Sequence, residues 1–492
     1  MKLWTGFLLV NFVVSQGASA AQEPTDVLVK FKSQRAMIQY SAMSLRGGVK
    51  VENLGFGNWA HMDIPPSAAA FINFESLRNS PLVLKVQPNY KLRVIEDYAQ
   101  EGIVQNPNYL AEILTIASLQ APPKAPELKP ELPILISSTG GKGEDPLLKN
   151  QWGMQDIGVK NAWKQARGKG VIVGVIDTGV DYTHEDLLDN MWRNEGEIGF
   201  DNQGHDKSKN GVDDDHNGYV DDVMAWDFSD NDNKPYDVHG TLIDALLKGE
   251  NLGHGTHCAG NVAARGDNAK GISGVAPAAQ IMPLRFINKE GVGTTAGAIR
   301  AIMYGINNGA RVLSNSWGTE GEDPKEAGDN VALKEVITGG QEKGIIFVFA
   351  AGNGHKGVGY DNDTDPLPVV PASYAIENII SVAAIDKDNN LGKFSNWGLH
   401  TVHLAAPGVK VFSTTVGNNY TDTIIDLFGL KATWDGTSMA APHVAGAAAL
   451  YWSKHPEANW RAVKKALLDA TVPIASMKGK SVTGGKLNLD KL

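Results

Sequence analysis

The chain has 492 residues, a formal net charge of −10 and one cysteine, Cys258. Its length and its 42% hydrophobic content predict a large buried core and more than one domain. A single cysteine excludes an internal disulfide, and the acidic balance without a basic patch argues against nucleic-acid binding.

The N-terminus is typical of an exported protein. Residues 1–20, MKLWTGFLLVNFVVSQGASA, contain a lysine, a short apolar core and an Ala-Ser-Ala end, as in a cleavable signal peptide. The apolar stretch of about eight residues is too short to cross a bilayer, and no later segment reaches the roughly twenty residues needed. We therefore expect a secreted or periplasmic protein without a membrane span.

Residues 21–95 are predicted to form a small separate domain. Hydrophobic periodicity indicates a strand, a helix, two strands, a second helix and a last strand. This β-α-β-β-α-β order is the ferredoxin-like arrangement, although the pattern alone also fits other small α+β domains. The segments are DVLVKFK (26–32), RAMIQYSAMSL (35–45), two strands between 49 and 64, PPSAAAFINFESLRN (65–79) and VLKVQPNYKLRVI (83–95).

Residues 96–144 have the composition of a connector. A possible helix at 108–120 is followed by the proline-rich stretch APPKAPELKPELP (121–133), which should be extended. SSTGGKGED (137–145) is polar and glycine-rich, as are segments that proteases cut. We expect a processing site in this connector.

From residue 145 to residue 492, predicted helices and strands alternate. This alternation predicts an α/β domain with a doubly wound, mostly parallel sheet. VIVGVIDTGVD (171–181) begins as a buried strand and ends in the carboxylate of Asp177. Catalytic groups of such sheets collect at the carboxyl ends of strands, although a carboxylate there can also be a simple cap.

An acidic insert follows this strand. Between Asp201 and Asp237, eleven Asp and three Lys give −8 of the chain's −10. Asp213, Asp215 and Asn217 precede Gly218 as in the opening of an EF-hand loop, but the twelfth position is Met224 instead of Glu. The insert could bind calcium with the help of other carbonyls, or it could be a solvated acidic loop.

GHGTHCAG (253–260) places His254 at the start of a helix rich in small residues. His254, His257 and Cys258 lie close enough in sequence for a zinc site, but no second ligand pair stands at a suitable spacing. On a helix, His254 and Cys258 share one face, which places the thiol beside the imidazole. We expect His257 and His443 to be structural.

Two further segments contain residues suited to acyl transfer. FVFAAGN (347–353) is a strand followed by Asn353, whose amide could donate to an oxyanion or could simply be tolerated in a turn. GTSMAAPHVAG (436–446) places Ser438 at the start of an apolar helix. The unpaired N–H groups and the dipole of a helix N-terminus would stabilise negative charge there, although a serine at this position is often only a cap.

These motifs together, with Asp177, His254 and Ser438 in that chain order, resemble the subtilisin family of serine endopeptidases. In having a cysteine at position 258, the chain resembles the thermitase and proteinase K branches of this family. The resemblance implies a subtilisin-like fold in which Asp177, His254 and Ser438 form a catalytic triad. It also implies that Asn353 contributes to the oxyanion hole.

The resemblance extends to substrate binding. RVLSNSWG (311–318) resembles the segment that pairs with substrate backbone, so Ser316, Trp317 and Gly318 should line a peptide cleft. Ala351 and Gly352 are expected across from them. The domain at 21–95 resembles an inhibitory propeptide, in particular in VQPNYKLR, and would act as an intramolecular inhibitor.

Calcium is the cofactor that the resemblance implies. WDFSDNDNKP (226–235) resembles a thermitase-like calcium loop with Asp227, Asp230 and Asp232 as ligands. Asp186, nine residues after Asp177, matches a ligand of the family's tight calcium site. We expect structural calcium at Asp227, Asp230 and Asp232 first and at the loop of Asp213, Asp215 and Asn217 second.

The sequence therefore predicts a secreted, self-processing, monomeric serine endopeptidase that acts on proteins or peptides. A catalytically silent peptide-binding or scaffold protein on the same fold is the rival from another class. Filled positions at Asp177, His254, Asn353 and Ser438 favour the enzyme. An esterase or a peptide ligase would use the same triad, because acyl transfer accepts several nucleophiles.

Overall fold

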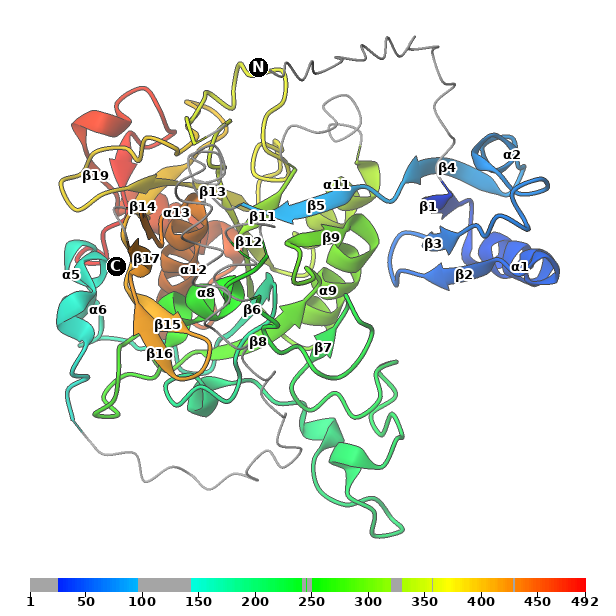
Figure 1. Cartoon of the computed structure of the whole chain (residues 1–492), viewed down its shortest axis with the longest axis horizontal. Helices are drawn as coiled ribbons and strands as arrows, with labels where there is room; N and C mark the ends of the chain where they lie inside the picture. Colours follow the sequence, from blue (N-terminus) through cyan, green and yellow to red (C-terminus); the bar gives the residue numbers. More distant parts are fainter. Residues whose placement is uncertain are drawn as a thin grey trace, which may run out of the picture. The chain divides into compact units, whose positions relative to one another are not determined.

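A computed structural model describes residues 25–95, 143–240, 245, 250–319, 330–355, 357–427 and 430–492 (Figure 1). Within these residues the chain divides into two compact units. The first comprises residues 25–53 and 58–88, and the second comprises residues 54–57 and the chain from Asn89 onward. The predicted signal peptide, the predicted helix at 108–120 and the proline-rich stretch lie outside the described residues.

The first unit is a four-stranded antiparallel sheet with two helices. Its strand order is β2-β3-β1-β4. Val27, Val29 and Phe31 alternate along β1 and point into one apolar core with Leu77. The elements are β1 (Asp26–Phe31), α1 (Gln34–Ser44), β2 (Lys50–Asn53), β3 (Trp59–Asp63), α2 (Phe74–Arg78) and β4 (Val83–Pro88).

Two expected elements of this unit differ in extent. The helix expected over 65–79 is confined to α2, because Asn73 and Ser76 form a capping box that starts the helix there. The strand expected over 83–95 is two strands, β4 and β5 (Lys91–Val94). β5 belongs to the second unit, where it pairs with other strands.

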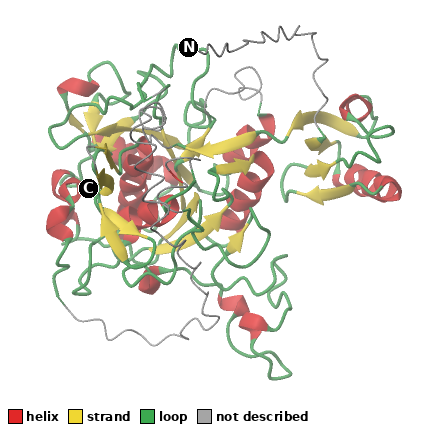
Figure 2. Ribbon diagram, in the orientation of Figure 1, coloured by secondary structure: helices red, strands yellow, loops and turns green. Residues whose placement is uncertain are grey.

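The second unit contains a nine-stranded sheet in the order β19-β20-β14-β13-β12-β10-β6-β8-β7. Figure 2 colours strands yellow and helices red. All neighbouring strands are parallel except β19 and β20. The prediction of a mostly parallel sheet is confirmed. The strands are β6 (Ile172–Asp177), β7 (Trp226–Asp227), β8 (Gln280–Arg285), β10 (Val312–Asn315), β12 (Ile346–Ala350), β13 (Ile379–Ile385), β14 (Leu404–Pro407), β19 (Val472–Pro473) and β20 (Gly485–Lys486).

Helices and short sheets complete this unit. The helices are α5 (Trp152–Asp156), α6 (Val159–Ala162), α8 (His254–Ala263), α9 (Thr295–Asn307), α11 (Val331–Gly339), α12 (Thr437–Lys454) and α13 (Trp460–Asp469). Three short strands form the sheet β11-β5-β9, with β11 at Trp317–Gly318 and β9 at Val292–Thr294. Two hairpins pair β15 (Ser413–Thr415) with β16 (Asn419–Thr421), and β17 (Thr423–Leu427) with β18 (Leu430–Thr433).

Helices cover both faces of the large sheet. On β6, Gly174 and Asp177 are three residues apart, so their Cβ positions point to opposite faces. A Cβ at Gly174 would meet Leu313 and Leu284, and a Cβ at Gly305 of α9 would meet the same two side chains. Helix α9 therefore covers the face of Gly174. A Cβ at Gly255 of α8 would instead lie 3.2 Å from Asp177 Cβ, so α8 covers the other face.

Small residues allow α12 to lie deep in the core. A Cβ at Gly446 would come within 2.7 Å of Val275 Cβ and 2.9 Å of the Val262 carbonyl at the end of α8. A larger residue would push the two helices apart. Because α8 and α12 both begin near the carboxyl ends of the parallel strands, their first residues lie close to Asp177 and Asn353.

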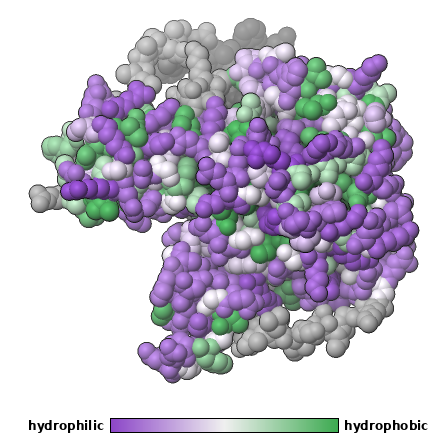
Figure 3. Space-filling model, turned by 180° about the vertical axis from the view of Figure 1, so that it is seen from behind, coloured by the Kyte–Doolittle hydropathy of each residue, from purple (hydrophilic) through white to green (hydrophobic). Residues whose placement is uncertain are grey.

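In the described residues no helix is long and apolar enough to cross a membrane. On the face shown in Figure 3, hydrophilic residues predominate, and apolar residues are scattered among them.

Candidate active site

Asp177 and His254 form a buried pair. Asp177 is the last residue of β6, and His254 is the first residue of α8. The Asp177 Oδ1 atom lies 2.7 Å from His254 Nδ1, and both side chains are 1% exposed. His254 Nε2 is buried and has no hydrogen-bond partner among the described residues, so the nitrogen opposite Asp177 is free to accept a proton.

The charge of Asp177 controls the basicity of this histidine. Burial acts to lower the pKa of His254, but the charges and hydrogen bonds of Asp177 and Cys258 together outweigh burial and hold the pKa well above its ordinary value. The same contact fixes the tautomer, because Nδ1–H donates to Asp177 and leaves Nε2 as the base.

A second buried carboxylate, Asp237, connects the segment that carries Asp177 to the helix that carries His254. It accepts hydrogen bonds from Thr178 Oγ1 at 2.9 Å, Asn251 Nδ2 at 2.7 Å, Thr256 N at 2.8 Å and Thr256 Oγ1 at 2.6 Å. Thr178 follows Asp177, and Thr256 is in the first turn of α8. Asp237 therefore ties the end of β6 to the start of the helix that carries His254.

Asn251 fixes where that helix begins. Its Oδ1 accepts from Gly253 N at 2.9 Å and from His254 N at 2.8 Å. These bonds satisfy N–H groups that a helix N-terminus leaves unpaired. Sequence analysis missed both Asp237 and Asn251. An asparagine shortly before the predicted helix start was a usable signal for a cap, whereas Asp237 belongs to no recognisable pattern.

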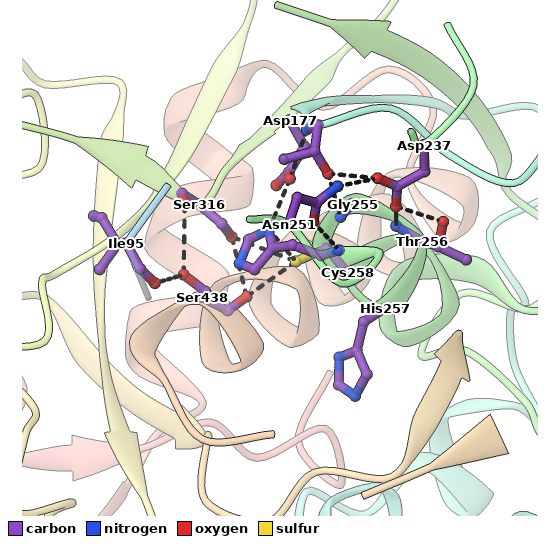
Figure 4. Close-up of polar contacts among 12 residues, drawn as sticks. Ile95, Asp177, Asp237, Asn251, Gly255, Thr256, His257, Cys258, Ser316 and Ser438 are labelled. Carbon is purple, nitrogen blue, oxygen red and sulfur yellow. Dashed lines mark hydrogen bonds and ion pairs between the residues drawn. The ribbon is translucent and has the colours of Figure 1, made fainter. Parts of the chain in front are cut away.

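His254 and Cys258 of α8 lie together with Asp177, with ligand atoms within 4.8 Å of one another, whereas His257 lies apart. Cys258 Sγ lies 3.9 Å from His254 Nδ1, as expected from their spacing, and burial raises the pKa of its thiol. The His257 ring points away from both, as Figure 4 shows, and its Nε2 lies 3.0 Å from the Val411 carbonyl. His257 also stacks on Trp434, and burial lowers its pKa to about 3, in agreement with a structural role.

Ser438 lies in the first turn of α12, beside Asn353. Asn353 Oδ1 accepts from the Thr437 N–H and the Thr437 hydroxyl, each at 2.9 Å. These two donors orient the amide so that its Nδ2 points toward the cleft. There Asn353 Nδ2 and Ser438 Oγ donate to the same acceptor, the Ile95 carbonyl, at 3.1 Å and 2.5 Å.

The segment that delivers this carbonyl, β5, lies in the cleft as an added strand. Val94 pairs with Trp317, and Arg93 pairs with Gly318, on the β11 side. On the other side, residues 91–93 pair with β9. The Ile95 N–H donates to the Ser316 carbonyl at 3.1 Å. The backbone of Ile95, which contacts Ser438, is therefore hydrogen-bonded through both its N–H and its carbonyl.

Ser316, Trp317 and Gly318 thus contact the docked strand through their backbone. Ala351 and Gly352, expected across from them, do not form the second side of the sheet; β9 does. The Ala351 carbonyl accepts from Asn362, and the Gly352 N–H donates to Thr437, so these two residues support Asn353 and α12. Sequence analysis did not find β9, because Val292–Thr294 is too short to show a strand pattern.

Three acidic side chains gather in the acidic insert. Glu197, Asp215 and Asp222 place carboxylate oxygens within 4.8 Å of one another. Glu197 Oε2 is buried without a hydrogen-bond partner among the described residues. Burial, together with the charges of Asp222 and Asp215, raises the pKa of Glu197 to about 6. Of the residues predicted in this loop, only Asp215 belongs to the cluster.

Of the other two predicted ligands of this loop, Asp213 binds the loop backbone and Asn217 binds two carboxylates of the cluster. Asp213 accepts from Asn217 N at 3.1 Å and from Gly218 N at 2.8 Å. The Asn217 amide nitrogen donates to Asp215 and Asp222. Glu197 was missed because it lies before the loop pattern in the sequence, and only the fold brings it there.

The loop expected to bind calcium first holds an arginine. Arg285 is 3% exposed, and its Nη1 pairs with both Asp227 and Asp230. Asp232 joins Asp227 through backbone hydrogen bonds in both directions, at 2.8 Å and 3.1 Å. Asp227 and Asp230 share the single positive charge of this guanidinium, so two of the three carboxylates expected to bind calcium already have a cationic partner.

Asp186 lies apart from both acidic loops. It is fully buried and accepts from Asn268 Nδ2 and from Ile272 N, each at 2.7 Å. Burial raises its pKa to about 6. In this structure N–H donors occupy both carboxylate oxygens of Asp186, and the contacts tie the segment after β6 to the loop at 266–272.

Known proteins match much of the chain. The family model "Peptidase_S8: Subtilase family" matches residues 168–489, which include Asp177, His254, Asn353 and Ser438. A thermophilic serine proteinase from Bacillus sp. (strain AK1) is 34% identical over 305 residues, covering 62% of this chain and 58% of that protein. Thermitase from Thermoactinomyces vulgaris is 33% identical over 317 residues, covering 64% of this chain and 87% of thermitase.

A solved structure agrees in fold. Fervidolysin from Fervidobacterium pennivorans, described as a keratinolytic enzyme related to subtilisin, aligns with a TM-score of 0.63 at 24% identity. The alignment covers 96% of this chain and 62% of the fervidolysin chain. With a family model spanning well over half of its length, the chain belongs to the subtilase family of serine endopeptidases.

Proposed function

We propose that this chain is the precursor of an exported serine endopeptidase that cleaves its own Ile95–Glu96 bond before it acts on other proteins. Asp177, His254 and Ser438 act as the triad, and Asn353 acts as an oxyanion donor. The position of the Ile95 carbonyl, between Ser438 Oγ and Asn353 Nδ2, carries the proposal. This bond lies immediately before the range 96–145 in which the sequence predicted processing.

We infer the chemistry from these contacts together with the mechanism common to Ser-His-Asp triads. Ser438 Oγ attacks the Ile95 carbonyl carbon while His254 Nε2 takes the hydroxyl proton, and Asp177 stabilises the resulting imidazolium. The oxyanion that forms is stabilised by Asn353 Nδ2 and by the N-terminus of α12. His254 then returns the proton to the nitrogen of Glu96, which leaves, and water hydrolyses the acyl-enzyme.

The first unit is proposed as the transient inhibitory domain. Its strand order β2-β3-β1-β4, with antiparallel neighbours and two helices, supports the ferredoxin-like arrangement. Its C-terminal continuation, β5, occupies the strand-addition site that a substrate needs. The released segment therefore competes with substrate until it is degraded, and export by residues 1–20 places the enzyme outside the cytoplasm.

Self-processing gives a direct test. We expect the purified full-length chain to release a fragment that ends at Ile95 and a product that begins at Glu96. Since the bond is already seated on Ser438, the reaction should be first order, with a rate constant independent of protein concentration. Intact-mass and N-terminal sequencing of early time points measure both. A first cut within 137–145, or a rate that rises with concentration, would contradict the seated geometry.

We propose calcium at Glu197, Asp215 and Asp222. The buried, unpartnered Glu197 oxygen and the close carboxylates fit a hard cation that prefers oxygen ligands. Such an ion would neutralise charge that the fold otherwise leaves uncompensated. Asp222 also accepts a hydrogen bond from the Tyr304 hydroxyl of α9, so the ion would fasten the insert to the sheet's helical layer.

Calcium should raise the melting temperature of wild-type protein by several degrees. Binding to the native state alone contributes about 2.7 kcal/mol at a hundredfold excess over Kd. Glu197→Gln should lose this increment, whereas Asp230→Asn in the arginine-paired loop should keep it. Because the folded pKa of Glu197 is raised, stability without calcium should fall as pH rises through about 6, so the calcium increment should be larger at pH 7 than at pH 5.

Thermal unfolding of chelator-treated protein, with and without millimolar calcium, measures the increment. Equal melting temperatures for wild-type protein would contradict the site. A calcium increment that survives in Glu197→Gln and disappears in Asp230→Asn would move the site to the loop of Asp227.

A further inference from the structure

The side chain of Ile95 is enclosed at the point where a substrate would present the residue before the cleaved bond. Ile95 is 0% exposed, and its N–H and carbonyl are both hydrogen-bonded in the cleft. The place of its Cδ1 atom therefore marks the pocket that selects this substrate residue. Gly318 forms one wall, because a Cβ there would lie 3.3 Å from Ile95 Cδ1.

Val369 lies next to Gly318 on this wall. The same Cβ position on Gly318 would lie only 2.8 Å from Val369 Cγ1. The end of the Ile95 side chain and a methyl of Val369 thus border the same small space. The other methyl, Cγ2, would lie 2.6 Å from a Cβ on Gly352, the residue before Asn353. Val369 therefore reaches from the β11 side of the cleft to the oxyanion side.

The backbone around Val369 is held in place. Its carbonyl accepts from Ser373 N at 3.0 Å. The next residue, Val370, accepts from Thr319 N at 2.9 Å and donates to Thr319 Oγ1 at 3.3 Å. Val369 is 2% exposed, so a longer substrate side chain cannot push it toward solvent without breaking these contacts.

We propose that Val369 restricts the residue before the cleaved bond to aliphatic side chains of the size of Val, Ile or Leu, and that it disfavours aromatic residues. The inference rests on the proposed function and specifies its substrates. An aromatic ring would overpack the space that Ile95 fills, and a charged side chain would be buried against methyl groups without a partner. Differences of one or two carbon groups in such a pocket change kcat/KM by about 10- to 200-fold.

The test uses self-processed enzyme and peptides with the sequence of residues 91–98, in which the residue at position 95 is Ile, Val, Leu, Ala or Phe. Wild-type enzyme should cleave the Ile peptide at least about tenfold faster in kcat/KM than the Phe peptide. Val369→Ala should reduce or invert this ratio, and Val369→Ile should shift preference toward Val and Ala. Val482→Ala, which changes a valine that is 50% exposed, is the matched control and should keep the wild-type ratio.

Variants at positions 95 and 369, tested singly and together, examine how Ile95 fits beside Val369 in the precursor. Ile95→Phe should slow the first self-cleavage, and the double variant Ile95→Phe/Val369→Ala should recover part of the lost rate. A preference of wild-type enzyme for Phe, or an unchanged ratio in both Val369 variants, would overturn the specificity role while leaving the peptidase intact. Failure of folded wild-type protein to cleave any peptide would instead refute the proposed function.

Discussion

Ser438→Ala should reduce peptide hydrolysis and self-processing by about 10⁶-fold, the scale known for loss of the nucleophile in subtilisin. The hydroxyl contacts only the Ile95 carbonyl at 2.5 Å and the Ser316 carbonyl at 3.5 Å among the described residues, so its removal should leave the fold intact. The variant should accumulate as uncleaved precursor. Single-turnover processing and kcat with a peptide of residues 91–98 measure the loss.

Ser453→Ala is the matched control, because Ser453 lies on the same helix and donates only to the Leu450 carbonyl and accepts from the Gly168 N–H. It should process and hydrolyse like the wild-type protein. Processing of purified Ser438→Ala at a normal rate would show that another group attacks the Ile95–Glu96 bond. Retained precursor with full peptidase activity would be equally incompatible with a single nucleophile.

Asp177→Asn should lower kcat by about 10⁴-fold while KM changes little. The asparagine has the same size, but it cannot hold His254 with Nδ1 protonated or stabilise the imidazolium. Asp426→Asn, an exposed carboxylate paired with Lys431, should leave kcat unchanged. Loss of binding instead of turnover would argue that Asp177 shapes the cleft and has no part in proton transfer.

The pH dependence of kcat/KM distinguishes an electrostatic role of Asp177 from a purely structural one. Loss of a purely structural contact would not shift the midpoint of the acidic limb. His254 must be neutral to accept the serine proton, so activity is lost as pH falls through its pKa. In wild-type enzyme the acidic limb of kcat/KM should lie above pH 6.5, because Asp177, together with Cys258, raises that pKa against the effect of burial. In Asp177→Asn the limb should move to lower pH, and an unchanged midpoint would contradict the electrostatic coupling.

The parts of the molecule that local sequence determines could be predicted. The buried run before Asp177, the glycine and small residues of α12 and the alternation of helices and strands each depend on neighbours in the chain, and the structure contains a large, mostly parallel sheet. The extent of α2 could not be read from periodicity, because the capping box at Asn73 and Ser76 overrides the helical pattern before it.

The parts that depend on distant residues could not be predicted. Arg285 is far from Asp227 in sequence, so its occupation of the predicted calcium loop is visible only once β7 and β8 pair. Glu197 joins Asp215 and Asp222 through the fold of the insert. The division of 83–95 into β4 and β5 follows from pairing with β9 and β11, which no pattern within that segment encodes.

Ser438 is the proposed nucleophile, and the precursor's own Ile95 is bound beside it. A serine-directed fluorophosphonate, with mass mapping of the adduct during self-processing, tests this claim most directly. We expect a single adduct on Ser438 that appears only as the Glu96 N-terminus forms and the segment ending at Ile95 leaves. An adduct on another serine, or an active processed enzyme that the reagent neither labels nor inhibits, would contradict the claim.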